Sequence, residues 1–247
     1  MWSAGVTLLS GGLDSTTVTT HALTKVDQLT ALTFNYGHTH SKEVTCAQKI
    51  AKMLGIQHKL IDISFLADIA WYSSLTNPTR FTTPKARTEQ EINSGVPITY
   101  VPLRNTMFIT IAGAYLESQL LYAIEAEGYD SKEISGHIFL APNAIDYSGY
   151  PDCRPEYYDK MRESLCYGSK LWTQYKVPMN IETPIIHLSK AQIVEMAIDL
   201  NVPLHHTWSC YQGNDIPCGL CDSCILRAKG FLEAGFQDPL LARPITG

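Results

Sequence analysis

The residues most able to do chemistry stand near the start of the chain, where small, hydroxyl and acidic side chains follow an apolar run. Residues 10–16 read Ser-Gly-Gly-Leu-Asp-Ser-Thr and come directly after residues 6–9, Val-Thr-Leu-Leu. A strand, a glycine-rich turn and a helix in this order place backbone N–H groups and the positive end of the helix around one small volume. Gly11 and Gly12 let the backbone approach an anion closely. The segment predicts a phosphate-binding loop, in which the Asp14 carboxylate can hold a metal ion.

The order of these residues separates the loop from two other phosphate-binding loops. It has neither the Gly-Lys-[Ser/Thr] of the nucleotide-triphosphatase loop nor the Gly-x-Gly-x-x-Gly of dinucleotide-binding proteins. The pattern is similar instead to that of ATP pyrophosphatases, which split ATP into AMP and pyrophosphate. The resemblance predicts ATP as the ligand of Leu9, Ser10, Gly11, Gly12, Leu13, Asp14, Ser15, Thr16 and Tyr36. A plain Gly-Gly turn between a strand and a helix is the alternative.

A second candidate site is a cysteine cluster near the end of the chain. Cys210, Cys218, Cys221 and Cys224 follow the spacing Cys-x7-Cys-x2-Cys-x2-Cys. Four thiolates that converge on one Zn²⁺ leave no position for water, so such a site is structural. An iron–sulfur cluster is the competing interpretation, and zinc is favoured because no redox partner motif occurs elsewhere. The isolated Cys46 and Cys166 are expected to be small buried apolar residues.

Three further segments place polar side chains at the end of a predicted strand or the start of a predicted helix. Residues 36–40, Tyr-Gly-His-Thr-His, follow a predicted strand, and His38 and His40 are expected either to contact a polar substrate or adenine or to be structural. Arg104 and Asn105 start a predicted helix, where the Arg104 guanidinium can pair with a phosphate or a carboxylate. Lys190 stands at another helix start and can add positive charge near a nucleotide. A surface salt bridge for Arg104 and a solvated Lys190 are the alternatives.

Residues 146–154 combine tyrosine and aspartate side chains in one short loop. The sequence Asp-Tyr-Ser-Gly-Tyr-Pro-Asp-Cys-Arg suits a flat heteroaromatic ligand that is stacked on one face and hydrogen-bonded at its edge. The candidate binding residues of this loop are Asp146, Tyr147, Tyr150 and Asp152.

The elements that must position these residues alternate between strands and helices. Strands are predicted over residues 6–9, 29–35, 58–63, 133–139 and 181–186, and helices over 15–25, 41–54, 105–125, 154–171 and 193–200, the last capped by Ser189. This alternation predicts an α/β fold with a doubly wound parallel sheet, whose ligands bind beyond the carboxyl ends of the strands. Residues 1–203 would form the ATP-binding and substrate-binding domain, and residues 204–247 a small zinc-binding region packed on it.

Composition excludes several other classes of protein. The chain has 247 residues, 45% of them hydrophobic, and a net charge of −5 without a Lys/Arg run, which argues against nucleic-acid binding. We expect neither a membrane span nor a signal peptide. Seven cysteines, an odd number, argue against a secreted disulfide scaffold and favour a reducing cytoplasm. Apolar helices would permit a homodimer.

Over nearly its whole length the chain resembles the 7-cyano-7-deazaguanine synthase family. The resemblance rests on the loop at 10–16, Val-Pro-Leu-Arg-Asn-Thr at 101–106, the loop at 146–156, Leu-Ser-Lys at 188–190, Thr-Trp-Ser-Cys-Tyr at 207–211 and Cys-Gly-Leu-Cys-Asp-Ser-Cys at 218–224. It implies a fold of the adenine nucleotide α-hydrolase type and a C–N ligase that uses ATP, Mg²⁺ and Zn²⁺. The implied reaction converts 7-carboxy-7-deazaguanine and ammonia to the nitrile through an acyl adenylate and an amide, with Asp14, Arg104 and Lys190 as catalytic residues.

The chain departs from the family pattern near the expected substrate pocket. The family usually has Gly at the position of Leu103, Asp at that of Asn35 and Gln-Arg at those of His38 and Thr39, and a shorter segment before the aromatic loop. These changes motivate an alternative, a paralogue that couples the adenylated carboxylate to another amine, such as a protein, or stops at the amide. A tRNA-modifying enzyme on the same scaffold would need a basic surface or further catalytic cysteines.

Overall fold

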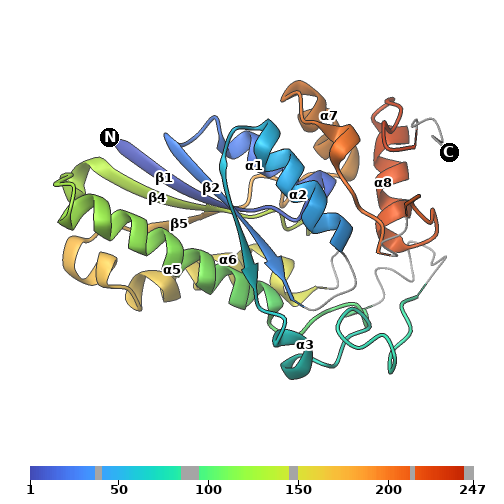
Figure 1. Ribbon diagram of the computed structural model, residues 1–247, viewed down its shortest axis with the longest axis horizontal. Coiled ribbons are helices and arrows are strands. Elements are labelled where there is room, and N and C mark those ends of the chain that lie inside the picture. The colour runs from blue at the N-terminus through green and yellow to red at the C-terminus, as the bar shows by residue number, and fades with distance from the viewer. Residues whose placement is uncertain (37–40, 85–94, 145–149, 212–214, 242–247) are drawn as a thin grey trace.

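The computed structural model describes residues 1–36, 41–84, 95–144, 150–211 and 215–241 of the chain. Within these ranges, five parallel strands form one sheet in the order β3-β2-β1-β4-β5 (Figure 1). The strands are β1 (Trp2–Leu8), β2 (Gln28–Asn35), β3 (Gln57–Asp62), β4 (Ile134–Phe139) and β5 (Met179–Glu182). The order runs outward from β1 in both directions, which confirms the predicted doubly wound parallel sheet.

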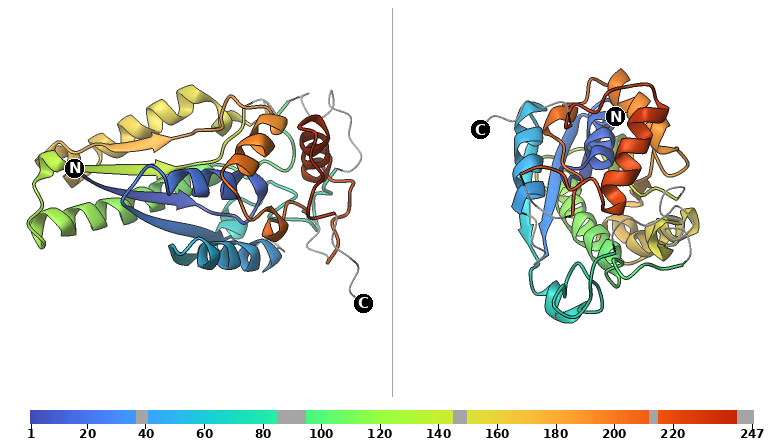
Figure 2. Two further views of the ribbon diagram at one scale, coloured as in Figure 1. Left: turned by 90° about the horizontal axis from the view of Figure 1, so that it is seen from above. Right: turned by 90° about the vertical axis from the view of Figure 1, so that its right-hand side faces the viewer.

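Helices cover both faces of this sheet (Figure 2). α1 (Leu13–Ala22), α2 (Ser41–Met53) and α7 (Lys190–Asp199) pack on one side, and α5 (Arg104–Glu125) and α6 (Pro155–Tyr167) on the other. α8 (Asp222–Glu233) packs against α7. The short helices are α3 (Leu66–Ile69), η1 (Ser131–Glu133), η2 (Pro151–Cys153), the π-helical η3 (Leu171–Tyr175) and η4 (Leu204–His206).

Side chains of β1 alternate between the two layers, as the period of a strand requires. Ala4 and Val6 join the core beneath α5, whereas Thr7 faces α1, where its hydroxyl shares a 2.9 Å hydrogen bond with that of Thr19. α1 carries several threonines, whose hydroxyls donate to carbonyls one turn earlier; Thr19, for example, donates to the Ser15 carbonyl at 2.7 Å. These bonds satisfy the hydroxyl donors of the helix within the helix itself.

Several predicted boundaries differ from those observed. β1 begins at Trp2 rather than at residue 6. The strand predicted over 181–186 is β5 at Met179–Glu182; Ile185 and Ile186 are buried, but in the turn after it. The helix predicted over 154–171 ends at Tyr167, and the π-helical turn η3 follows. α8 is not predicted at all, because its buried positions include Asp222, Arg227 and Gly230 and form no apolar stripe.

The C-terminal region shares the core of the sheet. Phe231 of α8 packs with Val18 of α1 and with Ile193 and Val194 of α7, and its side chain is 2% exposed. The last helix therefore closes the α1 side of the sheet.

α5 corrects the expectation that no apolar segment reaches the length of a membrane span. Its 22 residues are long and apolar enough by length and composition. Residues from Ile109 to Ala123 on one side of the helix are nevertheless buried against β1 and β4. This is the packing of a core helix.

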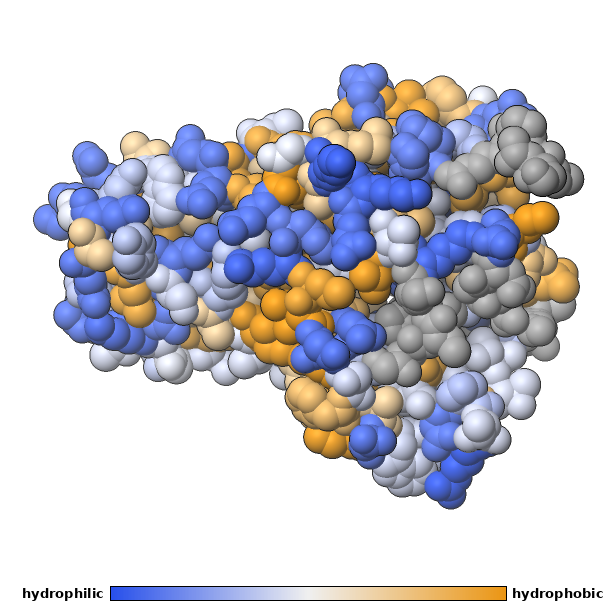
Figure 3. All heavy atoms as spheres, in the orientation of Figure 1, coloured by the Kyte–Doolittle hydropathy of each residue, from blue (hydrophilic) through white to orange (hydrophobic). Residues whose placement is uncertain are grey.

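Large apolar side chains are exposed near α3. Phe65 and Ile69 are 55% and 69% exposed. Figure 3 shows hydrophobic residues gathered on this face above α3, between hydrophilic areas.

Candidate nucleotide and substrate site

A cavity of about 350 Å³ lies beyond the carboxyl ends of β1, β2 and β4. β1 lies between β2 and β4, so the cavity sits at the point where the strand order reverses, the usual ligand position in such sheets. Most of the predicted site residues line it: Leu9, Ser10, Gly12, Leu13, Asp14, Ser15, Tyr36, Arg104, Asn105, Tyr150, Asp152 and Lys190. The fold therefore brings five separate segments of the chain to one place.

Hydroxyl groups hold the loop between β1 and α1 in a fixed shape. Ser10 Oγ and Ser15 Oγ share a 2.9 Å hydrogen bond, and the Ser10 backbone N–H donates to Ser15 Oγ at 3.2 Å. Gly12 is the N-cap of α1 and has no side chain to accept from the first turn. The N–H groups of that turn are without intrahelical partners, so an anion can accept from them.

Two predicted loop residues do not line the cavity. Gly11 has φ +85°, and a Cβ there would lie 2.6 Å from the Glu43 carbonyl oxygen of α2. Gly11 is therefore needed for the turn and for close packing of α2. Thr16 is fully buried, and its hydroxyl donates to the Gly12 carbonyl at 2.7 Å. Gly11 and Thr16 therefore support the shape of the loop on the side away from the cavity.

Asp14 and Lys190 form an ion pair inside the cavity. Lys190 Nζ lies 2.7 Å from Asp14 Oδ2, and the two side chains are 8% and 24% exposed. Lys190 is the first residue of α7, where Ser189 and Gln192 form a capping box that fixes the backbone. The pair joins the phosphate-binding loop to α7, 176 residues later in the chain.

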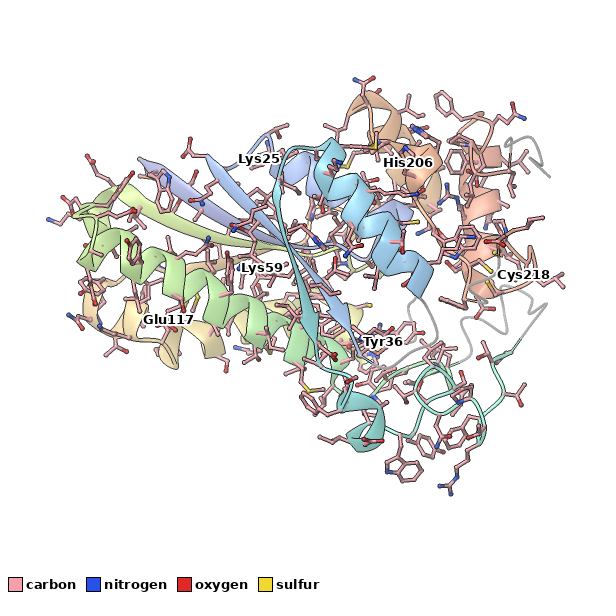
Figure 4. The ribbon with its side chains drawn as sticks, viewed as in Figure 1. Lys25, Tyr36, Lys59, Glu117, His206 and Cys218 are labelled. Atoms are coloured by element: carbon pink, nitrogen blue, oxygen red, sulfur yellow. The ribbon has the colours of Figure 1, made fainter. Side chains whose placement is uncertain are left out.

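Arg104 faces the pair from the other side of the cavity. Its Nη1 donates to Tyr36 Oη at 3.3 Å, and its guanidinium lies over the rings of Tyr36 and Phe108. Burial opposes the charged form, but Tyr36, Tyr150 and Asp152 together raise the pKa of Arg104 above its usual range. The guanidinium therefore stays charged. Figure 4 places Tyr36 where β2 ends, near the start of α5.

Asp152 and Tyr150 also line the cavity. Asp152 is 7% exposed, and burial raises its pKa above the ordinary value of 3.8, although Arg104 opposes the shift. Tyr150 shares a 2.7 Å hydrogen bond with the hydroxyl of Thr99. Burial also raises the pKa of the neighbouring Cys153 to about 12, so its thiol stays protonated. The other predicted binding residues, His38, His40, Asp146 and Tyr147, lie outside the described residues.

Within residues 207–211 the sequence predicts a role for Cys210, as a metal ligand, but none for Trp208, Ser209 and Tyr211, which line the cavity beside the loop. The Trp208 backbone N–H donates to the Gly11 carbonyl at 2.8 Å, and Lys42 Nζ lies 4.0 Å from the centre of the Trp208 ring. The buried Arg227 of α8 donates to the hydroxyls of Thr207 and Ser209 at 2.8 and 3.2 Å. The tryptophan in Thr-Trp-Ser-Cys-Tyr was the available signal.

The four predicted cysteines converge at the start of α8. The Sγ atoms of Cys210, Cys218, Cys221 and Cys224 all lie within 4.8 Å of one another. Around a tetrahedral Zn²⁺ with Zn–S bonds of about 2.3 Å, neighbouring sulfurs are about 3.8 Å apart. The four thiols therefore fit a metal ion with little rearrangement. Figure 4 shows Cys218 beside α8.

Backbone donors around the cluster favour thiolates. The Cys218 N–H donates to Cys210 Sγ at 3.3 Å, and the Leu220 and Cys221 N–H groups donate to Cys218 Sγ at 3.4 Å. Cys224 donates to the sulfur of Cys221, which lowers the pKa of Cys221 to about 5 and raises that of Cys224. Cys166 is buried, 7% exposed, as expected, whereas Cys46 is only partly buried and packs beside the cluster.

The fold and the cavity define an α/β protein with a cavity at the usual ligand position of a doubly wound sheet and a C-terminal cysteine cluster that could hold a metal ion. The chain belongs to the 7-cyano-7-deazaguanine synthase family: residues 4–235 match the family described as queuosine biosynthesis protein QueC. A 7-cyano-7-deazaguanine synthase of Thermoplasma volcanium is 43% identical over 95% of this chain and 89% of its own length. One of Microcystis aeruginosa is 43% identical over 99% of this chain and 97% of its own.

Solved structures of other proteins are more distantly similar. An NMN synthetase from Francisella tularensis superposes with a TM-score of 0.39 at 19% identity, over 96% of this chain and 77% of its own.

Proposed function

We propose that the protein converts 7-carboxy-7-deazaguanine and ammonia to 7-cyano-7-deazaguanine at the expense of ATP. The observation that carries the proposal is one cavity that joins the loop of residues 10–16, the Asp14–Lys190 pair and the wall of Arg104 and Asp152. The chain covers 89% and 97% of the length of two relatives named 7-cyano-7-deazaguanine synthase. Their names favour the nitrile as product over an amide or a protein conjugate.

The reaction begins with a poor electrophile. A carboxylate oxygen of the substrate attacks the α-phosphorus of ATP, pyrophosphate leaves, and an acyl adenylate forms. Ammonia then attacks the acyl carbon, AMP leaves, and a proton is released to give the amide. The amide oxygen attacks a second ATP in the same way, and loss of AMP with the remaining N–H protons forms the nitrile.

Each part of the cavity has a role in this scheme. Ser10, Ser15 and the first-turn N–H groups of α1 would bind the phosphates. Lys190 and the permanently charged Arg104 would stabilise the charge that develops on phosphate oxygens. Asp14 is the carboxylate suited to hold Mg²⁺, whose charge offsets that of the phosphates.

The opposite wall is suited to a guanine-like ring. Phe108 stacks on Phe34 with ring centroids 4.2 Å apart and presents an aromatic surface beside Arg104. Asp152 would accept hydrogen bonds from the N–H edge of the ring, and Tyr150 would contact its face. Asn105 is assigned to the same substrate, with His38, His40, Asp146 and Tyr147 from the adjoining segments.

The cysteine cluster is proposed to hold Zn²⁺ in a small C-terminal region, residues 204–247. This region would pack on the ATP-binding and substrate-binding domain, residues 1–203. Four thiol ligands leave no open position, so the ion would brace the wall formed by Trp208. All seven cysteines are free thiols, which fits the cytosol. A homodimer stays a prediction, to be tested by light scattering.

The rival reading as a thiol-dependent tRNA-modifying enzyme is disfavoured. Cys153, the cysteine that lines the cavity, has a raised pKa, whereas a catalytic thiol needs a lowered one.

The proposal is tested by product analysis with ammonia as the nitrogen donor. Mass spectrometry should find the nitrile and AMP from the wild-type protein, and Asp14→Ala should abolish AMP release. An amide or a protein adduct without nitrile would overturn the product assignment. Unchanged AMP release by Asp14→Ala would overturn the assignment of the nucleotide site.

A further inference from the structure

Gly230 of α8 lies directly against the stem of Lys190. A Cβ built on Gly230 would be 2.3 Å from Lys190 Cγ, 3.0 Å from its Cβ and 3.1 Å from its carbonyl carbon. The Cγ, Cβ and carbonyl carbon of Lys190 lie on or next to the backbone of α7, so they cannot move away as the end of a flexible side chain can. The two helices therefore meet here at a distance that only glycine permits.

The place of a glycine inside a helix needs a reason, because glycine is less stable there than alanine. Gly230 is buried and is followed by Phe231, which packs into the core shared with α7. Gly113 of α5 offers a comparison. A Cβ there would meet the branched end of Leu165 at 3.0 Å, a group that can move. Of the two glycines, only Gly230 lies against the backbone of another helix.

Lys190 is held on three sides. The capping box of Ser189 and Gln192 fixes its backbone, Asp14 binds its ammonium at 2.7 Å, and α8 covers its stem. A side chain at Gly230 would push on the third side, and the displacement would pass along the lysine to its ammonium.

We infer that Gly230 is a positioning residue: its missing side chain lets α8 press on Lys190 and sets the ammonium beside Asp14 in the cavity. This inference rests on the proposed function, because Lys190 is assigned there to the phosphates of ATP. Gly230 itself lies behind the lysine and does not line the cavity.

The test compares Gly230→Ala with the matched helix variant Gly113→Ala. A displacement of about 1 Å in a catalytic group can cost about a hundredfold in rate, so we expect kcat for AMP formation to fall by about that factor in Gly230→Ala. The KM for ATP should change far less, and Gly113→Ala should keep the wild-type kcat. A Gly230→Ala variant with the kcat of Gly113→Ala would overturn the inference. Absence of turnover in the wild type would instead overturn the proposed function.

A second comparison separates positioning from packing. In a Lys190→Ala background the Cγ contact is gone, and the remaining contacts, 3.0 Å to Cβ and 3.1 Å to the carbonyl carbon, need shifts of only a few tenths of an ångström. Adding Gly230→Ala to that background should therefore cause no further loss of kcat. If Gly230→Ala alone fails to fold, the double variant should fold and show the activity of Lys190→Ala. A double variant that is unfolded, or much less active than Lys190→Ala, would assign Gly230 to the packing of α8 and refute the positioning role.

Discussion

Arg227 and Asp238 form a buried two-bond ion pair between α8 and the segment that follows it. Arg227 Nε donates to Asp238 Oδ2 at 2.7 Å and Nη2 donates to Oδ1 at 2.9 Å, with side chains only 5% and 4% exposed. The remaining nitrogen reaches Thr207 and Ser209. The pair therefore fixes the part of the cavity wall that Trp208, Ser209 and Arg227 line.

Removal of the Asp238 carboxylate should lower the free energy of unfolding strongly. Asp238→Ala leaves the Arg227 charge buried without its carboxylate, and we expect a loss of about 3–5 kcal/mol in the free energy of unfolding, measured in urea. The exposed Lys160–Glu163 pair is the control, since Glu163→Ala should cost about 1 kcal/mol or less. Equal losses in the two variants would contradict the buried role of Asp238.

Asp152 should give the reaction a pH limb on the acid side. Because its folded pKa is raised above 3.8, the carboxylate takes up a proton at a higher pH than an ordinary aspartate as the pH falls. Protonated Asp152 accepts fewer hydrogen bonds, so kcat/KM for the deazaguanine substrate should fall through this pKa. Asp152→Asn should remove the limb and lower kcat/KM at neutral pH about 10-fold to 100-fold.

The control for this profile is Asp27→Asn. Asp27 is bound to Ser3 at the far end of β1, and its pKa is lowered rather than raised. Its variant should keep the wild-type limb, and loss of the limb there would remove Asp152 from its assigned role.

Leu103 holds a backbone conformation that costs stability. It precedes α5 with φ +54° and is 62% exposed, so its side chain gains little from burial. Leu103→Gly relieves about 1–2 kcal/mol of strain and adds unfolded-state entropy worth up to about 1 kcal/mol. We expect a small net rise in the free energy of unfolding. Leu232→Gly, in the exposed helical part of α8, should lower it by about 1 kcal/mol; a fall in both variants would contradict the strain at Leu103.

Metal removal should act on stability before it acts on nucleotide binding. The cluster cysteines pack with Trp208 and Leu240 in one small core, so a chelator should lower the melting temperature. The Kd for ATP should change little at temperatures where the protein stays folded. Elemental analysis should find zinc in the wild type and in Cys166→Ser, and none in Cys221→Ser. A brown protein with charge-transfer absorbance would replace zinc by an iron–sulfur cluster.

The sequence predicts the elements that bury one regular apolar face. It does not predict the elements whose buried residues depart from that pattern. Strands β1 to β4 and helices α1, α2 and α5 follow from periodicity, because each buries one regular face, whereas the short helices α3 and η1 are not predicted. Ile185 and Ile186 extend the apolar pattern of β5 into a turn, and burial alone cannot distinguish a strand from a turn. α8 escapes prediction because its buried positions include Asp222, Arg227 and Gly230, which interrupt the apolar pattern of the helix.

The candidate site shows the same division. Ser10, Asp14, Arg104 and Lys190 are predicted from local motifs and meet in one cavity. The roles of Trp208 and Arg227 depend on contacts with Gly11 and Asp238, which no local pattern encodes.

The hydrogen bond from Trp208 to Gly11 also sets an order of assembly during synthesis. The phosphate-binding loop leaves the ribosome well before its neighbours Lys190, Trp208 and Arg227, which come more than 170 residues later. Strands β1 to β3 can pair early, as segments of a nascent chain fold from the N-terminus. The nucleotide cavity is completed only when the final quarter of the chain has been made, so a truncated chain would carry the loop without its binding site.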